Sequence, residues 1–384
     1  MTHRNIVSDM TAGLDRMKAW LAKGLRPVGP AGATGGRRPI GLALQGGGSW
    51  GAYTWGVLDA LLAGRSVAIA QLSGTSAGAI NAAIVASALA KGSSSDARRM
   101  LRSFWLAMAD PTLSSVAREL WRPVEHKWRD SIGAWLWSSG VLSPYTANPL
   151  GINPLREAIA AHVDIDAIRS KLAPALYVTV TNVRTGLPRI IANDEMTIDA
   201  LLASASLPQL FQAVEIDGEA YWDGGYCGNP TLWPMMHSDI SRDLIVVQLV
   251  PDLADNVPKD APSIRRRIGE IVFNSSLVAE MQAIAAMRSV AGRGAGVANA
   301  LDVRMHRIGP PRRELLESGS SLERSRSWLE LLYDEGRAEA RQFILRHGAD
   351  LGVRETLDIA RVYADDHKPK LRVSAKENLS RALV

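Results

Sequence analysis

Cysteine is almost missing from this chain: Cys227 stands alone among 384 residues. A single cysteine excludes a disulfide within the chain and a zinc site built on cysteines, and it is typical of a reducing compartment. His-Glu-x-x-His, EF-hand and clustered cysteine–histidine patterns are missing as well. We therefore expect a cytoplasmic protein that needs neither a metal nor another cofactor.

Long apolar runs are the second absence. No stretch reaches the roughly 18 consecutive apolar residues that a membrane-spanning helix needs, and the first ten residues contain no signal-peptide core. We expect a protein that is soluble or bound peripherally to a membrane or lipid granule. The net charge of +5 and the pI near 9.4 favour anionic surfaces only weakly, and we expect no nucleic acid partner.

Two glycine-framed turns lie between residues 40 and 81, and each follows a short apolar run and precedes a helix-like one. In the order strand, helix, strand, helix, these runs cover residues 40–44, 52–62, 67–72 and 77–89. The order is typical of a parallel sheet covered by helices, in which ligands bind at the carboxyl ends of the strands. Further strand-like runs lie at residues 176–183, 189–192, 214–216, 220–222 and 244–250.

The second turn, Gly74-Thr75-Ser76-Ala77-Gly78, fits the nucleophile elbow, a strained strand-to-helix turn that lifts a serine hydroxyl above the sheet. Glycines flank the serine because side chains would clash in so tight a turn. The long helix that follows directs the positive end of its dipole at Ser76, which favours a developing negative charge there. Ser76 is therefore a candidate nucleophile.

The first turn contains Gly46, Gly47 and Gly48, with Gly51 three residues further on. Glycines let backbone N–H groups approach an oxyanion, as acyl transfer requires. The same G-x-G-x-x-G spacing is also the dinucleotide-binding fingerprint. That fold needs an acidic residue at the end of the second strand to bind the ribose, and residues 65–73 contain no Asp or Glu. A nicotinamide or flavin enzyme is therefore disfavoured.

A third motif completes a pattern: Asp223-Gly224-Gly225 follows a predicted hairpin, after the run Ala-Ser-Ala-Ser-Leu-Pro at residues 203–208 and Phe211. With these motifs in this order, residues 39–250 resemble the patatin-like phospholipase family, whose bacterial members often carry a helical C-terminal domain similar to residues 264–351. The resemblance implies an α/β protein with a three-layer α/β/α fold, a central mostly parallel sheet and a helical C-terminal extension. It also implies hydrolysis of lipid acyl esters by a Ser–Asp dyad without histidine.

Carried over by position, the resemblance makes Ser76 the nucleophile and Asp223 the general base. The oxyanion hole would comprise Gly46, Gly47, Gly48 and Ala77. The turns would be shaped by Gly51, Gly74, Gly78, Gly224 and Gly225. One departure is Trp50, which stands where the family usually has Arg or Lys. A cation near the oxyanion loop is therefore missing, which weakens electrostatic support for an oxyanion or a lipid phosphate.

Two alternatives stay open. Ser76, Asp223 and either His237 or His306 would satisfy the Ser…Asp…His order of an α/β-hydrolase triad. In that fold, however, additional strands separate the oxyanion loop from the elbow, whereas here the two turns end successive strands. The second alternative is a non-catalytic scaffold on a lipid surface or storage granule, against which the retained serine, aspartate and glycines argue.

The chain divides into four predicted segments: residues 1–38 (amphipathic helix and linker), 39–251 (catalytic domain), 262–364 (helical region) and 365–384 (basic tail). Within the catalytic domain, residues 105–150 form a Trp-rich insertion or lid. Its tryptophans are Trp105, Trp121, Trp128, Trp135 and Trp137. Tryptophans beside basic residues suit a lipid headgroup boundary, although packing in the core explains them equally well.

Overall fold

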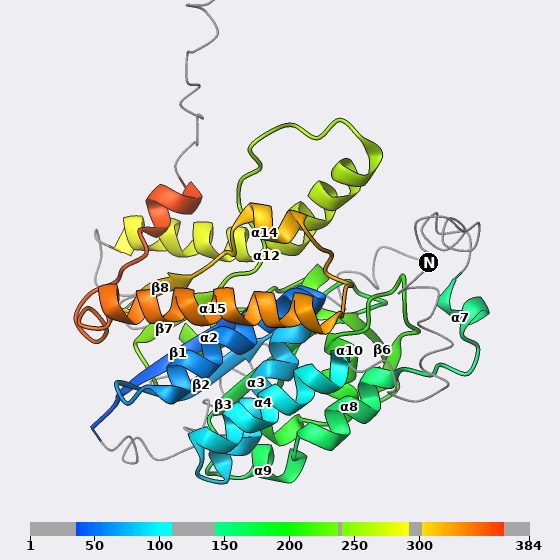
Figure 1. The fold of residues 1–384 in the computed structure, drawn as a ribbon, viewed down its shortest axis with the longest axis horizontal. Coiled ribbons are helices and arrows are strands. Elements are labelled where there is room, and N and C mark those ends of the chain that lie inside the picture. The colour runs from blue at the N-terminus through cyan, green and yellow to red at the C-terminus, as the bar shows by residue number, and fades with distance from the viewer. Residues whose placement is uncertain (1–35, 110–142, 237–239, 292–301, 365–384) are drawn as a thin grey trace, which may run out of the picture.

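A computed structural model describes residues 36–109, 143–236, 240–291 and 302–364 (Figure 1). In them, one mixed eight-stranded sheet lies between two layers of helices, so the predicted three-layer α/β/α fold is confirmed. Three predicted features lie outside the described residues: the N-terminal helix, the basic tail, and the part of the Trp-rich insertion that carries Trp121, Trp128, Trp135 and Trp137. Among the helices described, none is long and apolar enough to cross a bilayer.

The sheet has a parallel centre and an antiparallel side. Its order is β5-β6-β3-β2-β1-β7-β8, and β4 pairs with β3 off this path. The parallel strands are β1 (Arg38–Leu44), β2 (Val67–Gly74), β3 (Ala175–Asn182), β7 (Asp243–Val247) and β8 (Arg304–Ile308). The antiparallel strands are β4 (Pro188–Ala192), β5 (Val214–Ile216) and β6 (Glu219–Asp223).

Helices cover both faces of the sheet. The first layer contains α2 (Gly51–Ala63), α3 (Ala77–Ala90), α4 (Ser94–Ala109), α8 (Pro154–His162), α9 (Ile165–Arg169), α10 (Ile198–Ser204) and α15 (Arg326–His347). The second contains α11 (Trp233–Met236), α12 (Ala261–Ala291) and a π-helical turn, η4 (Ala360–Ala364). Shorter elements are α7 (Pro144–Ala147), α14 (Arg313–Glu317) and the 3₁₀ turns η1 (Gly48–Trp50), η2 (Asn193–Glu195) and η3 (Gly224–Tyr226).

Each face of the sheet has its own hydrophobic core, because successive side chains of a strand point to opposite faces. In β7, Ile245 and Val247 belong to the larger core, beneath the first helical layer. Leu244 and Val246 belong to the smaller core, beneath α12. Burial on both faces explains why this strand appears in the sequence as a continuous apolar run.

The region 262–364, expected to be helical, also contributes an edge strand to the central sheet. β8 pairs in parallel with β7, and α15 lies along α2 on the first face (Figure 1). The two helices approach closely at glycines: a Cβ atom on Gly336 would lie 2.0 Å from the carbonyl oxygen of Tyr53, and one on Gly56 would lie 2.0 Å from that of Tyr333. The C-terminal region is therefore packed directly on the helix that follows the first glycine turn.

Candidate active site

The two glycine turns meet at the carboxyl ends of β1 and β2. Leu44 and Gly74 are paired at the end of the two strands, and the amide of Thr75 donates to the carbonyl of Leu44 at 3.3 Å. This juxtaposition follows from the order strand, helix, strand, since successive parallel strands here are neighbours in the sheet. The structure thus brings together the turns that sequence reasoning singled out.

Ser76 occupies a strained turn between β2 and α3, with φ 56° and ψ −127°. A non-glycine residue in such a conformation costs about 1–3 kcal/mol, and residues of this kind cluster at functional sites. The amide of Ser76 donates to Ser204 Oγ at 3.0 Å, and that hydroxyl donates to the carbonyl of Thr179 at 2.8 Å. The turn is therefore fastened through α10 to β3.

The flanking glycines are required by close backbone contacts. A Cβ atom on Gly74 would lie 2.6 Å from the carbonyl oxygen of Gly78, and one on Gly78 would lie 2.2 Å from that of Leu44. A Cβ atom on Gly51, at the start of α2, would lie 2.7 Å from the Cβ of Ala77. The turn therefore leaves no room for side chains at these positions.

Asp223 is the last residue of β6 and is fully buried. Its Oδ1 accepts a hydrogen bond from the amide of Gly225 at 2.8 Å. Burial raises the pKa of Asp223 to about 7, although the Gly225 amide and the Ser76 hydroxyl act to lower it. The Ser76 hydroxyl thus lies close to the Asp223 carboxyl group. The second carboxyl oxygen, Oδ2, is buried, and no donor of the described residues forms a hydrogen bond with it. The structure brings Ser76 and Asp223 together without a well-aligned hydrogen bond between them.

The first turn presents only some of its amides to the site. The amide of Gly46 donates to Asn229 Oδ1 at 2.6 Å, and that of Ser49 donates to the carbonyl of Ser321 at 2.7 Å. Within the described residues, the amides of Gly47, Gly48 and Ala77 have no acceptor. Of these three residues, Gly48 and Ala77 also line the cavity at Ser76, so their amides are open to a ligand, whereas that of Gly46 is already engaged.

Close contacts also explain the two glycines of the third motif, Asp223-Gly224-Gly225. A Cβ atom on Gly224 would lie 2.1 Å from the carbonyl oxygen of Thr179, and one on Gly225 would lie 2.4 Å from the ring of Phe273 in α12. Both glycines therefore allow the chain after β6 to turn tightly beside β3 and beneath α12. This is the turn expected to bring Asp223 close to Ser76.

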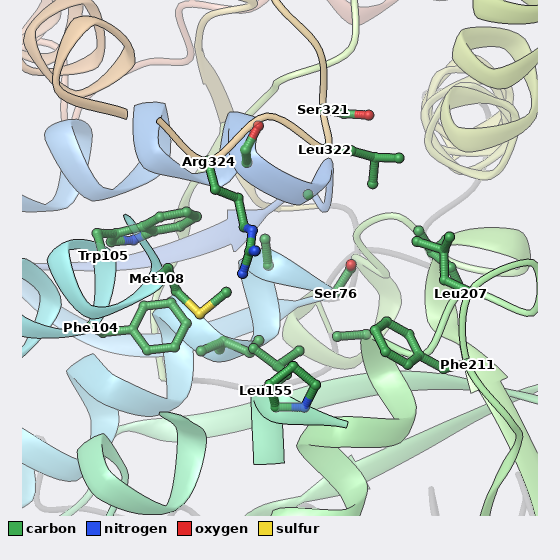
Figure 2. A pocket seen from close by; sticks show the side chains of 17 residues that line it. Ser76, Phe104, Trp105, Met108, Leu155, Leu207, Phe211, Ser321, Leu322 and Arg324 are labelled. Atoms are coloured by element: carbon green, nitrogen blue, oxygen red, sulfur yellow. The ribbon is translucent and has the colours of Figure 1, made fainter. Parts of the chain in front are cut away.

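A cavity opens at Ser76, and its lining is mostly apolar (Figure 2). Residues from α3, α4, the start of α8, the segment after α10 and the loop before α15 surround it. The lining residues are Gly48, Ser49, Ser76, Ala77, Ile80, Phe104, Trp105, Met108, Pro154, Leu155, Ala205, Leu207, Leu210, Phe211, Ser321, Leu322 and Arg324. Such a cavity suits an acyl chain whose carbonyl lies at the serine.

Trp105 belongs to this cavity and to the core. It is buried, and its indole N–H donates to Asn81 Oδ1 at 3.0 Å, while Asn81 donates to the carbonyl of Gly51 at 3.0 Å. For this tryptophan the core interpretation holds. Trp50 is buried in the larger core, and its side chain is not among those that line the cavity.

Several residues of the site were not identified from the sequence. Asn229 holds the glycine turn through Gly46, Ser204 holds the amide of Ser76, and Ser321 and Arg324 reach the cavity from the loop before α15. Ser204 lies within the run that contributed to the family resemblance, which could have indicated it. The others belong to segments with no local pattern that reveals their contacts.

The histidine alternatives receive no support. His306 lies on β8, separated from β2 by β1 and β7, and is fully buried. Its ring nitrogens contact Thr356 Oγ1 at 2.9 Å and Asp243 Oδ1 at 3.2 Å. His306 therefore belongs to a different polar cluster, and His237 lies outside the described residues. Among the described residues, no group of His, Cys, Asp or Glu side chains could hold a metal ion.

A model of the family "Patatin-like phospholipase" matches residues 42–236, about half of the chain and both site turns together with Asp223. Among solved structures, "Crystal structure of VipD from Legionella pneumophila" matches with 15% sequence identity and a TM-score of 0.40, over 81% of this chain and 67% of that chain. A likeness this distant bears on neither mechanism nor substrate. No curated protein matches.

Proposed function

Because the chain belongs to the patatin-like phospholipase family, whose general activity is the hydrolysis of lipid acyl esters, we propose a specific mechanism. In it, the protein hydrolyses fatty-acyl esters of lipids through a Ser76–Asp223 dyad. The observation that carries the proposal is the pair itself. Ser76 sits in a strained elbow that faces an apolar cavity, beside a fully buried carboxyl group with a raised pKa. Strain and a perturbed pKa in one cavity are marks of a functional site.

The proposed reaction has two steps. Ser76 Oγ attacks the ester carbonyl while its proton moves to the carboxylate of Asp223, and the lipid alcohol leaves with that proton. Water then attacks the acyl-enzyme and gives a proton to Asp223, which returns it to Ser76 as the fatty acid is released. A carboxyl group with a pKa near 7 is suited to both transfers, because it can accept and release a proton near neutral pH.

Oxyanion stabilisation is proposed for the amides of Gly47, Gly48 and Ala77. They belong to the glycine turn and to the N-terminus of α3, and they have no acceptor among the described residues. The helix dipole of α3 adds to their effect, since its positive end faces the charge that develops on the carbonyl oxygen. Gly46 was expected to donate as well, but its amide is bonded to Asn229, so we leave it out of the proposed hole.

The substrate ester is carried in a lipid phase, so we also propose that the protein works as a peripheral protein at a membrane or lipid-granule surface in the cytoplasm. The exposed apolar face of α12 supports this proposal. Ile264, Ile268, Ile271 and Val272 lie at helical spacing and are all exposed, and the guanidinium-bearing Arg265 flanks them. Apolar side chains beside cations suit an anionic lipid surface.

The test of catalysis uses paired variants. We expect Ser76→Ala and Asp223→Asn each to reduce hydrolysis of a short-chain nitrophenyl ester by at least about a thousandfold, because each removes one half of the dyad. Ser289→Ala and Asp334→Asn are matched controls, since both residues are exposed and lie outside the site. Full turnover by either dyad variant would contradict the mechanism.

The same assay separates the alternatives. If the wild-type protein binds lipid vesicles but cleaves no ester from a total lipid extract, the non-catalytic scaffold is the better description. If His306→Ala abolishes turnover while leaving the protein folded, a Ser–Asp–His esterase is favoured. We expect the wild type to cleave esters, because Ser76 faces the cavity beside Asp223. We expect His306→Ala to stay active, because His306 is engaged with Asp243 and Thr356.

A further inference from the structure

The three glycines of the first turn need support from outside the turn. Glycine has more conformational freedom than any other residue, so the run 46–48 is ordered only if other groups hold its ends. Gly48 has φ 58°, in the left-handed region that glycine adopts readily. One end of the run is held within the stretch that matches the family, where the amide of Gly46 donates to Asn229 Oδ1 at 2.6 Å. The other end leads into Ser49.

Ser49 is bonded to the C-terminal region through both its backbone and its side chain. Its amide donates to the carbonyl of Ser321 at 2.7 Å, and its Oγ donates to the carbonyl of Ser320 at 2.9 Å. The indole of Trp328, in the first turn of α15, donates to the same Oγ at 3.3 Å. All three partners lie outside residues 42–236, the stretch that matches the family. The second end of the glycine turn is therefore held by a part of the chain that the family match does not include.

The loop that offers these carbonyls, residues 318–325 between α14 and α15, is closely packed on both sides. A Cβ atom on Gly319 would lie 2.6 Å from the ring of Trp328. One on Gly48 would lie 2.2 Å from the carbonyl oxygen of Ser321. The loop is thus packed between α15 and the glycine turn, and α15 in turn lies along α2 (Figure 1).

The bond at Ser49 also constrains the glycine before it. The Ser49 N–H and the Gly48 carbonyl belong to one planar peptide unit, so an N–H held on Ser321 fixes ψ of Gly48. Gly48 lines the cavity at Ser76, and Ser321 lies at the same cavity (Figure 2). Oxyanion donors act through preorganisation, and a misplacement of about 1 Å can cost about a hundredfold in rate.

We propose that the C-terminal region positions the oxyanion turn through Ser49 and Trp328, which makes this region part of the active site. The proposal rests on the acyl hydrolase function proposed above. Both residues are positioning residues: they act through the amides of Gly47 and Gly48, and they take no part in proton transfer. Their loss should therefore slow the chemical step more than it weakens substrate binding.

The first test separates kcat from KM. Trp328→Phe removes the indole N–H that holds Ser49 Oγ, and Ser49→Ala removes that Oγ. The substrate is a short-chain nitrophenyl ester, and active sites are counted by end-point labelling with a fluorophosphonate, so that misfolded protein does not enter kcat. We expect kcat to fall about tenfold in Trp328→Phe and further in Ser49→Ala, with KM changed by less than about twofold, because the oxyanion forms only in the transition state.

The matched controls lose the same kind of hydrogen bond elsewhere. Tyr333→Phe removes a hydroxyl of α15 that donates to Asp59 Oδ2 at 3.1 Å. Ser241→Ala removes a buried hydroxyl that donates to the carbonyl of Pro39 at 2.8 Å. Both controls should keep the kcat of the wild type. An unchanged kcat in both test variants, or an equal fall in the controls, would overturn the proposal.

A binding measurement separates this proposal from the proposed reaction. Calorimetric titration of Ser76→Ala with decanoate, below its micelle concentration, requires no turnover. At about pH 6 the Asp223 carboxyl group, with its pKa of about 7, is largely protonated and does not repel the anion. The carboxylate can then accept hydrogen bonds from the amides of the oxyanion turn, so the added substitution Trp328→Phe should weaken its binding about fivefold, whereas added Tyr333→Phe should not.

The titration and the kinetics can fail independently. If the wild type cleaves no ester but the titration behaves as expected, the catalytic proposal fails and the positioning of the glycine turn by the C-terminal region stands. Equal affinities in the two double variants would refute the positioning even in an active enzyme.

Discussion

At the scale of single residues, the two side chains of the proposed dyad are both held in unfavourable states. Ser76 has a backbone conformation that L-residues rarely adopt, and Asp223 has a carboxyl group removed from water. Hydrogen bonds to Ser204 and from Gly225 hold Ser76 and Asp223 in these states. Close packing at the neighbouring glycines leaves no room for other arrangements. Such local strain is compensated by the rest of the fold, as is common where a site must be preorganised.

The raised pKa of Asp223 predicts a pH profile. Asp223 must be ionised to accept the serine proton, and burial raises its pKa to about 7. We therefore expect kcat/KM for a short-chain nitrophenyl ester to be constant above about pH 7 and to fall roughly tenfold per pH unit below it. The residual rate of Asp223→Asn should lack this limb. A limb near pH 4 would mean that the ionising group is an ordinary solvated carboxylate.

At the scale of elements, glycines set how closely the parts of the site approach one another. At Gly78 the first turn of α3 meets the end of β1, and at Gly336 α15 meets α2. In both cases the neighbouring atom is a backbone carbonyl oxygen, which cannot rotate away as a side chain can. The spacing between α3 and β1, and between α15 and α2, therefore depends on hydrogen atoms in place of side chains at these positions.

The crossing of α2 and α15 yields a stability prediction. In Gly336→Ala the new Cβ would lie 2.0 Å from the carbonyl oxygen of Tyr53, so the helices must separate. We expect the free energy of unfolding to fall by about 2–3 kcal/mol in urea titrations. The control is Gly269→Ala in α12, where nothing lies within 4 Å of the new Cβ. Helix propensity should there increase stability by about 0.5–1 kcal/mol. A stable Gly336→Ala protein would indicate a looser helix contact.

The exposed face of α12 gives a prediction on lipid binding. Ile268 is 55% exposed at the centre of this face, and a carboxylate there would oppose both apolar insertion and an anionic surface. We expect Ile268→Glu to reduce flotation with phosphatidylglycerol-containing liposomes severalfold. Leu345→Glu is the control, because Leu345 is a more exposed leucine (85%) on a different helix, α15. Equal flotation of Ile268→Glu and wild type would exclude this face as the lipid contact.

At the scale of the whole molecule, a buried polar cluster joins the C-terminal region to the sheet. Asp243 accepts hydrogen bonds from Arg304 Nε and Nη2, both at 2.9 Å, from the amide of Gly352 at 2.9 Å, and contacts His306 Nε2 at 3.2 Å. Burial acts to raise the pKa of Asp243, but these bonds outweigh it and hold the pKa far below its usual range. The carboxylate therefore remains charged at all but very low pH.

This cluster predicts how stability depends on pH. Because the pKa of Asp243 is lower in the folded chain than in the unfolded chain (about 3.9), its stabilisation is present above about pH 4 and is lost as pH falls below it. Asp243→Asn should lower the free energy of unfolding by about 2–4 kcal/mol at pH 7, and by less at pH 3. Asp302→Asn removes an exposed ion pair with Arg242 and should change it by under about 1 kcal/mol. Urea unfolding at both pH values tests this. An equal loss at pH 3 and pH 7 would contradict the assigned charge.

The sequence predicted the fold and part of the site for physical reasons. The predicted strands, the hairpin and the helices at residues 52–62 and 77–89 follow from apolar periodicity, and each predicted boundary lies within a few residues of the observed one, whereas α8 and α9 were not predicted. The two glycine turns could be predicted to lie side by side, because successive parallel strands are often neighbours in the sheet. Asp223, by contrast, came from family resemblance, since 147 positions separate it from Ser76. No local pattern places it near the serine.

Contacts between distant segments explain what was missed. Asn229 and the loop with Ser321 and Arg324 reach the glycine turn only because α12 and α15 pack where they do. His306 satisfied the chain order of a triad, but the order of strands in the sheet separates it from Ser76. Chain order thus proved a poor guide where tertiary packing decides distance.

The loop before α15 has a consequence for the way the protein is made. Residues 320–324 form one wall of the cavity and lie against the first glycine turn. A chain emerging from the ribosome contains Ser76 and Asp223 long before these residues are synthesised. Until then its cavity lacks that wall and its α2 lacks the cover of α15. The binding cavity therefore stays incomplete until residues 320–324 have been synthesised, in a nascent chain that already carries both Ser76 and Asp223.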